Sequence, residues 1–148
     1  MAVKSATPPD MEGFKRLLKS KKLKATPQRL AVHEVMLDLG HASADMVCDR
    51  IRSRGGSVTV ASVYNILSQL ALLGIYSHRL SPNSKMYFDV NTGRHIHLFD
   101  TVNSEFRDIM DEEFVSMAES YFRKKRFRGY KVDSVEVQLL CHPTKKSR

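Results

Sequence analysis

Three segments in the first half of the chain each begin with a serine or threonine and end at a glycine. They extend from Thr26 to Gly40, from Ser43 to Gly55 and from Thr59 to Gly74. A Ser or Thr side chain at the start of a helix accepts a hydrogen bond from the first turn, whereas glycine readily adopts the left-handed conformation that follows the last turn. The segments therefore predict three successive helices with defined ends.

The apolar residues of these helices recur at spacings of three and four, which places them on one side of each helix. The predicted buried residues are Ala31, Val32, Val35, Met36 and Leu39 in the first, Met46, Val47 and Ile51 in the second, and Val60, Val63, Leu67 and Leu70 in the third. An earlier helix is predicted at 10–22, with Phe14, Leu17 and Leu18 on its apolar side. His33 is interpreted as a surface residue.

Two short segments, "IYSHRL" and "KMYFD", flank the turn "SPNS" and predict a two-stranded hairpin. Helices followed by such a hairpin are typical of a winged helix-turn-helix, in which one helix enters the major groove of DNA. A small helical domain of another kind is the alternative. Residues 1–89 are the predicted winged-helix DNA-binding domain.

The net charge of +8 is concentrated in this first part of the chain. Residues 1–88 carry 13 Lys and Arg against 6 Asp and Glu, whereas residues 89–148 carry 11 against 10. Such a basic module suits a polyanion, although a solvated charged surface is the alternative. The outer face of the helix after Thr59 has short or polar side chains that can approach a base edge. The candidate DNA-binding residues are Lys24, Arg29, Ser62, Tyr64, Asn65 and Gln69.

The second half predicts a smaller α/β module. Residues 111–126 predict a helix with acids in its first turn and bases in its last, as the helix dipole favours. Its apolar stripe would comprise Phe114, Met117, Ala118, Tyr121 and Phe122, followed by a strand, "VDSVEVQLL", in which Val135, Val137 and Leu139 alternate with polar residues. Arg123 to Arg128 are interpreted as the solvated helix end, with a second DNA patch as the alternative. So small a core predicts pairing with a second copy, a homodimer.

Between these modules the chain concentrates residues of the kinds that bind metals. His95 and His97 point to the same side of a strand, because side chains alternate with period two. Asp89 precedes them, Asp108 can lie on the partner strand, and His41 follows the Gly40 stop. Three nitrogens and two carboxylates without a thiolate favour iron(II) or manganese(II), although zinc would compete on affinity. The residues therefore predict one divalent ion per subunit.

The composition also restricts the class of protein. No apolar run approaches the roughly 20 residues that cross a bilayer, and the N-terminus has no apolar signal core, so the expected location is the cytoplasm without membrane association. The two cysteines, Cys48 and Cys141, provide no disulfide framework. No nucleophile and base accompany the metal-binding residues, so we expect a protein that is not an enzyme; a small metalloenzyme is the remaining alternative.

Several motifs together resemble the ferric uptake regulator family of metal-dependent winged-helix transcription regulators, over about 15–140. They are "TPQRLAVHEV", "HASAD", "VTVASVYNILSQL", and "YFD" and "HIH" followed by "RDI". The resemblance implies an α+β fold with an N-terminal winged helix, a hinge at 90–94 and a C-terminal α/β dimerisation domain at 95–148. It implies palindromic DNA operators, and it makes His41, Asp89, His95, His97 and Asp108 the regulatory metal site.

Within this family, aspartate at 108 and "VYN" resemble the peroxide-sensing branch. In that branch peroxide oxidises a histidine ligand of bound iron(II) and releases the protein from DNA. The oxidation-sensitive positions implied are His41 and His95. An iron- or haem-responsive regulator, or a member that binds DNA independently of metal, is the alternative; Arg94 before "HIH" weakens the haem interpretation, because haem-responsive members usually carry three consecutive histidines.

The sequence departs from the common family pattern where a structural zinc is usually bound. Asp100, Thr101, Val102 and Asn103 stand at the place of a C-x-x-C pair, and Cys141 is the one cysteine near the C-terminus. We therefore expect no structural zinc with four cysteine ligands.

Overall fold

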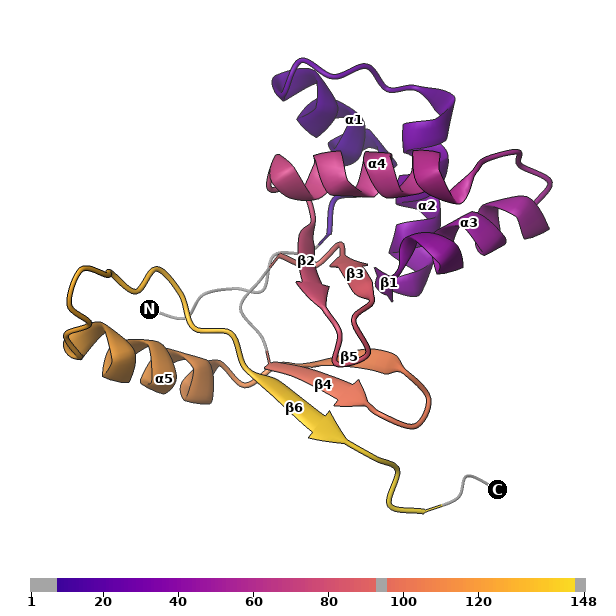
Figure 1. The fold of residues 1–148 in the computed structure, drawn as a ribbon. Coiled ribbons are helices and arrows are strands. Elements are labelled where there is room, and N and C mark those ends of the chain that lie inside the picture. The colour runs from indigo at the N-terminus through magenta and orange to yellow at the C-terminus, as the bar shows by residue number, and fades with distance from the viewer. Residues whose placement is uncertain (1–7, 93–95, 146–148) are drawn as a thin grey trace. The chain divides into compact units, whose positions relative to one another are not determined.

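The structure is a computed structural model that describes residues 8–92 and 96–145. The chain forms two compact units, with the boundary after Thr92. The N-terminal unit contains helices α1 to α4 and strands β1 to β3, and the C-terminal unit contains strands β4 to β6 and helix α5 (Figure 1). This organisation confirms the predicted α+β fold class.

The helices of the N-terminal unit begin where the sequence predicts. They are α1 (Met11–Ser20), α2 (Pro27–Leu39), α3 (Ala44–Ser53) and α4 (Val60–Leu72). The side chains of Thr26, Ser43 and Thr59 each accept a hydrogen bond from the backbone N–H three residues later. Gly40 follows α2 with a φ of 73°, a left-handed conformation that side chains with a Cβ rarely adopt. Local capping therefore sets the helix bounds.

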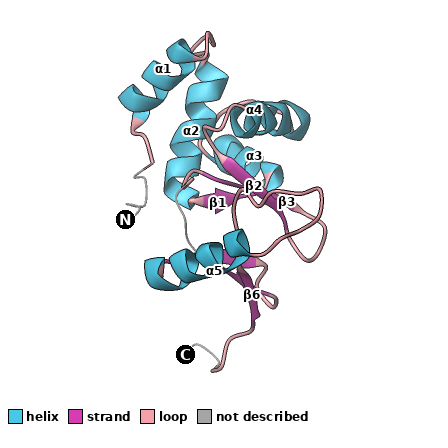
Figure 2. Cartoon of the chain, turned by 90° about the vertical axis from the view of Figure 1, so that its left-hand side faces the viewer, coloured by secondary structure: helices cyan, strands magenta, loops and turns pink. Residues whose placement is uncertain are grey.

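The predicted wing is present and belongs to a sheet of three strands. Strands β2 (Ser77–Leu80) and β3 (Met86–Asp89) pair antiparallel around the turn, where the backbone N–H of Ser81 donates to the carbonyl of Lys85. A short strand, β1 (His41–Ala42), pairs with the other edge of β3. This third strand was not predicted, and Figure 2 shows it among the strands of the N-terminal unit.

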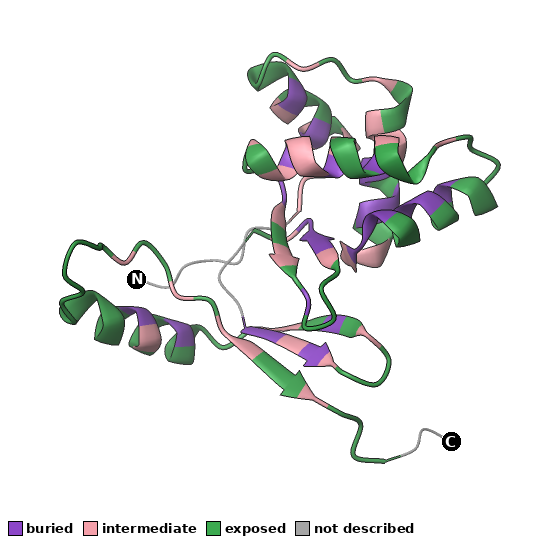
Figure 3. Ribbon diagram, viewed as in Figure 1, coloured by how far each residue is buried: buried purple, intermediate pink, exposed green. Residues whose placement is uncertain are grey.

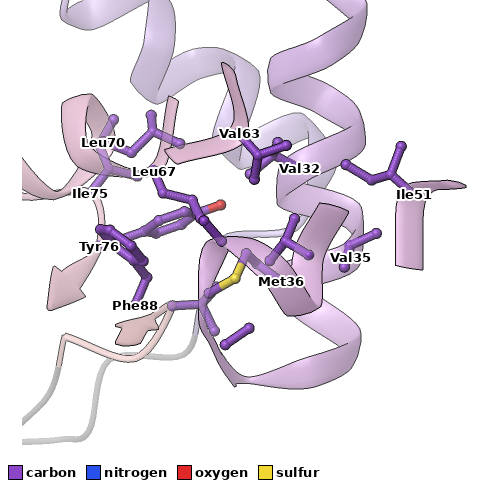
Figure 4. Packing of buried hydrophobic residues seen from close by; sticks show 14 of the residues in the cluster. Val32, Val35, Met36, Ile51, Val63, Leu67, Leu70, Ile75, Tyr76 and Phe88 are labelled. Atoms are coloured by element: carbon purple, nitrogen blue, oxygen red, sulfur yellow. The ribbon is translucent and has the colours of Figure 1, made fainter. Parts of the chain in front are cut away.

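The apolar core of the N-terminal unit joins all four helices to the wing. Buried residues from α2, α4 and β3 contact one another, including Met36, Leu67 and Phe88 (Figure 4). The predicted buried residues are largely confirmed, but Met46 and Val60 are 38% and 37% exposed. Both lie in the first turn of their helices.

The interpretation of His33 as a surface residue is wrong. Its side chain is fully buried and stacks on Phe14, with ring centroids 3.9 Å apart. Its Nε2 lies 2.8 Å from the carbonyl oxygen of Pro9, which can only accept, so Nε2 carries the proton and the Tyr76 hydroxyl donates to Nδ1 at 2.6 Å. Burial lowers the His33 pKa, and the Pro9 hydrogen bond and the Asp10 charge oppose this shift. The neutral imidazole therefore connects the segment before α1 to the core.

The C-terminal unit is a three-stranded sheet with one helix. Strands β4 (Ile96–Asp100) and β5 (Glu105–Ile109) pair antiparallel, and β6 (Gln138–Cys141) pairs parallel to β4. Helix α5 (Glu112–Lys124) connects β5 to the segment before β6. Rings of Phe99 and Phe106, with centroids 4.8 Å apart, form part of its small core.

Two expectations for this unit need correction. The strand predicted from Val132 to Leu140 is confined to Gln138–Cys141, because only these residues pair with β4. Within the single chain α5 buries Val115 and Glu119, whereas most of its predicted stripe is exposed (Figure 3). The exposed fractions are 37% for Phe114, 60% for Met117, 56% for Tyr121 and 39% for Phe122. The unit has too little other structure to cover these side chains.

The predicted domain bounds of 1–89 and 95–148 remain predictions. Val90, which belongs to the predicted hinge, donates its backbone N–H to the carbonyl of Gly40 in the N-terminal unit. Residues 93 and 94 of that hinge lie outside the described residues. Among the helices described, none has the length and apolar character to cross a membrane.

Candidate metal ligands and DNA-binding surface

His41 and the buried Asp89 form a pair in the N-terminal unit. They are direct partners in the β1–β3 register, and Nε2 of His41 lies 3.0 Å from Oδ2 of Asp89. The Asp89 side chain is 2% exposed and that of His41 is 13% exposed. Oδ1 of Asp89 accepts the backbone N–H of Asn91 at 2.7 Å, which fixes the carboxylate at the end of the wing.

His97 and Asp108 form a second pair of the same chemistry in the C-terminal unit. They face each other across β4 and β5, with Nδ1 of His97 3.3 Å from Oδ1 of Asp108. The His97 side chain is 4% exposed and its ring meets the Phe106 ring edge-on. The predicted position of Asp108 on the partner strand is thus confirmed. His95, the remaining predicted ligand, lies outside the described residues.

The spacing within each pair suits two ligands of one ion. Two donor atoms bound at about 2.1 Å and roughly at right angles lie about 3 Å apart. The pairs supply imidazole nitrogens and carboxylate oxygens without thiolate, a donor set that accepts iron, manganese or zinc. Burying a carboxylate is costly unless it is paired with hydrogen-bond donors or coordinates a metal, and the buried Asp89 is placed accordingly beside His41 and the Asn91 backbone N–H.

The exposed face of α4 borders an open groove of about 610 Å³. Tyr64 and Asn65 lie on one side of it, and Lys85 of the β2–β3 turn lies on another. The Tyr64 ring is 44% exposed and rests edge-on against Phe88, which orients it. Asp45 also lines the groove, 3.6 Å from the Lys85 amine. The groove combines these polar and basic groups with an apolar lining that includes Val60, Leu80 and Met86.

Other candidate DNA-binding residues have structural roles as well. Ser62 caps α4 reciprocally with Thr59. The Arg29 guanidinium donates to the Gln69 side chain at 3.1 Å and to the carbonyl of Lys24 at 2.9 Å. Arg29 therefore joins α2 to α4 and to the preceding loop, while the Lys24 side chain is exposed. Sequence reasoning missed this link, because residues 29 and 69 are far apart in the chain.

Asp100 organises the β4–β5 turn at the place where the family resemblance suggests zinc-binding cysteines. Its Oδ1 accepts the backbone N–H groups of Val102 and Asn103 at 2.9 and 3.0 Å, and its Oδ2 accepts the Asn103 side-chain amide at 2.8 Å. The bond from the Asn103 side chain is the main cause that lowers the Asp100 pKa. Thr101 donates through its hydroxyl and its backbone N–H to the carbonyl of Cys141. Hydrogen bonds thus join this turn to β6.

A winged-helix unit with an open groove beside α4 is joined to an α/β unit, and each unit carries a histidine–aspartate pair. Together these features are those of a transcription regulator with candidate metal ligands. The model of the ferric uptake regulator family matches residues 20–140, and the chain belongs to this family. Its members are metal-responsive transcription regulators rather than enzymes; they bind DNA and act as dimers.

Solved structures of similar proteins match the fold over most of the length of this chain. The ferric uptake regulator of Vibrio cholerae is 22% identical with a TM-score of 0.75, covering 88% of this chain and 99% of that one. The Pseudomonas aeruginosa regulator with manganese is 24% identical with a TM-score of 0.69, covering 88% and 98%. The Campylobacter jejuni peroxide stress regulator is 27% identical with a TM-score of 0.67, covering 89% and 97%. A comparison with curated protein sequences gave no significant match.

Proposed function

We propose that the chain is a metal-dependent repressor that senses peroxide, iron or both through one divalent ion per subunit. The ligands are His41, Asp89, His95, His97 and Asp108. The observation that supports this most strongly is the repetition of one arrangement, a largely covered histidine beside an aspartate on a neighbouring strand, in each of the two units. A catalytic or purely structural role would not require such a pair in both.

The proposed switch follows from the separate origins of the ligands. His41 and Asp89 belong to the winged-helix unit, whereas His97 and Asp108 belong to the α/β unit. If both pairs bind the same ion, the arrangement of the units that brings them together becomes more populated. The shift can be no larger than the difference in metal affinity between that arrangement and the others. Loss of one ligand removes this difference.

Peroxide is the proposed signal because of the ligand pattern. Asp108 and the "VYN" motif resemble the peroxide-sensing branch, and the Campylobacter jejuni peroxide stress regulator is among the similar structures. Under this proposal bound iron(II) supplies the reactivity toward peroxide, and the imidazoles of His41 and His95 are the groups oxidised. Manganese(II) would occupy the same ligands without that sensitivity.

The proposed DNA target is a palindromic operator read by a dimer. Two winged-helix units related by a twofold axis match two inverted half-sites. Tyr64 and Asn65 would reach base edges from the groove beside α4. Lys24 and Arg29 would contact phosphates, and Ser62 and Gln69 would lie at the same surface. The exposed aromatic and methionine side chains of α5 are proposed to contribute to the dimer interface.

The experiment measures metal content and operator binding of the purified dimer together. Elemental analysis gives the native metal, and DNA binding is compared with iron(II), with manganese(II), with a chelator and after peroxide. We expect metal-dependent binding and, in the iron form, addition of one oxygen to His41 or His95 by peptide mass spectrometry. Binding that survives chelation would support a metal-independent member, whereas iron dependence without histidine oxidation would support an iron-responsive one.

Matched variants separate the ligands from other surface groups. His97→Ala and Asp108→Ala should lower metal affinity, whereas His142→Ala and Asp133→Ala change the same residue types at exposed positions of the same unit. Equal metal affinity in all four variants would contradict the proposed ligand set.

A further inference from the structure

Residues 123–131, "RKKRFRGYK", form a basic segment with two aromatic residues at the end of α5 and in the loop beyond it. Six of its nine residues are Lys or Arg, and no acid occurs from Ser120 to Val132. The helix ends at Lys124. Complementing the helix dipole can therefore account for Arg123 and Lys124 but for none of the four basic residues beyond them.

The charges of this segment are available for a ligand. Arg123 pairs with the buried Glu119 at 3.6 Å, and the Lys125 amine lies 4.9 Å from the centre of the Tyr121 ring. Within the described part of the chain, Arg126, Arg128 and Lys131 have no carboxylate within salt-bridge distance. All three are exposed. The segment is a local excess of positive charge in a nearly neutral C-terminal half, larger than the group of Lys145, Lys146 and Arg148 near the end of the chain.

The backbone presents the two aromatic residues side by side. The backbone N–H of Tyr130 donates to the carbonyl of Phe127 at 2.8 Å, and the two residues form a β-bridge. Gly129, with a φ of 83°, permits the tight turn between them. The Tyr130 side chain is 83% exposed and that of Phe127 is 44% exposed. The turn borders an open pocket of about 500 Å³ whose wall also contains Arg126 and Arg128.

We propose that residues 123–131 bind single-stranded nucleic acid, as a site separate from the winged-helix surface. Proteins that bind single strands combine cations that follow the phosphate backbone with aromatic rings on which unpaired bases stack. The Arg and Lys side chains would supply the cations, and Tyr130 and Phe127 would supply the rings. A duplex would use only the charges, because its bases are already stacked on one another. Unpaired bases are therefore the ligand that uses both features.

The test uses the full-length dimer and a fluorescent oligothymidine at low salt, with binding followed by anisotropy. We expect Tyr130→Ala to weaken binding about tenfold, since it removes the ring on which one base stacks. Tyr64→Ala removes an exposed tyrosine of the winged-helix groove and should leave oligothymidine binding unchanged. Equal affinity of wild type and Tyr130→Ala for oligothymidine would overturn the proposal. An equal loss of affinity for a duplex of the same length would overturn it as well, because a duplex bound at the winged-helix surface does not use Tyr130.

A second pair of variants tests the charge component. Arg128→Glu and Lys145→Glu change the net charge equally and at exposed positions of the same unit. Arg128→Glu should lower the affinity and reduce the dependence of binding on salt, whereas Lys145→Glu should change both little. Identical effects of the two substitutions on affinity and on salt dependence would show a general effect of net charge, and would overturn the proposed site. Asn65→Ala should weaken operator binding without affecting oligothymidine, so this proposal and the repressor proposal can fail independently.

Discussion

His33 and Tyr76 share a hydrogen bond of 2.6 Å in the centre of the N-terminal unit, although 43 residues separate them in the chain. Tyr76→Phe would leave the Nδ1 acceptor of a fully buried imidazole without its donor. We expect this change to lower the free energy of unfolding by about 1–3 kcal/mol. Urea denaturation of the metal-free protein measures it, with Tyr64→Phe as a control for a change of the same type at an exposed position of the same unit. Unchanged stability in Tyr76→Phe would contradict a stabilising hydrogen bond between Tyr76 and His33.

The pH dependence of stability should also depend on His33. Burial lowers its pKa in the folded protein, so the unfolded chain binds a proton first as the pH falls. The stabilisation is thus complete above the unfolded value of 6.5 and is lost as the pH falls toward the lower folded value. One such group contributes a slope of at most about 1.4 kcal/mol per pH unit. His33→Gln should show a smaller loss of stability between neutral and mildly acidic pH than wild type, and parallel profiles would contradict this.

His41→Ala should weaken metal-dependent operator binding while the dimer remains intact. The imidazole is lost from the winged-helix unit, whereas the exposed apolar side chains of α5 are unchanged. Loss of one ligand among five should weaken metal binding by a factor of about 10 to 100, by analogy with the effect of altering groups that support metal ligands. Sedimentation measures whether the dimer remains intact, and operator titrations with manganese(II) measure the metal-dependent DNA binding. His78→Ala serves as the control, because His78 is an exposed histidine on β2. Dissociation of the dimer in His41→Ala would contradict the assignment of dimer contacts to the other unit.

Asp100→Ala should loosen the β4–β5 turn without unfolding the N-terminal unit. The variant loses the acceptor of three hydrogen bonds, to Val102, to the Asn103 backbone and to the Asn103 side chain. Amide hydrogen exchange at residues 102 and 103 should become faster, while exchange in α2 and α4 stays unchanged. Asp133→Ala provides a control at an exposed acid of the same unit. Unchanged exchange at the turn would show that the carboxylate does not hold it.

Arg29→Ala should weaken operator binding for two reasons: the loss of a positive charge, and the loss of the hydrogen bonds that position neighbouring residues. The guanidinium holds Gln69 of α4 and the carbonyl of Lys24, so its loss frees both. We expect Arg29→Lys, which keeps the charge but cannot form the same pair of bonds, to retain only part of the operator affinity. Gel-shift titrations compare the two variants with Lys24→Ala. Full operator affinity in Arg29→Lys would show that Arg29 acts through its charge alone, as a contact to a phosphate.

The local elements could be predicted because their signals lie within a few residues. Thr26, Ser43 and Thr59 each reach a backbone N–H three positions later, so the sequence alone sets where their helices begin. The wing and the pairing of β4 with β5 follow from short turns in the same way. Asp108 could be placed on the strand that pairs with the strand of His97, and the structure adds the register that sets the two residues opposite each other.

Only the tertiary structure decided the contacts between distant segments. The pairing of β1 with β3 sets His41 beside Asp89, and no local pattern distinguishes a two-residue strand from a loop. Burial of His33 required Tyr76 and Pro9 as partners, and the parallel pairing of β6 shortened the predicted strand to four residues. The sequence by itself thus determined the helix bounds, through local hydrogen bonding, and supplied the histidines and aspartates suited to bind a metal. Which residues lie beside each candidate ligand depended on packing between distant segments, which no short-range pattern encodes.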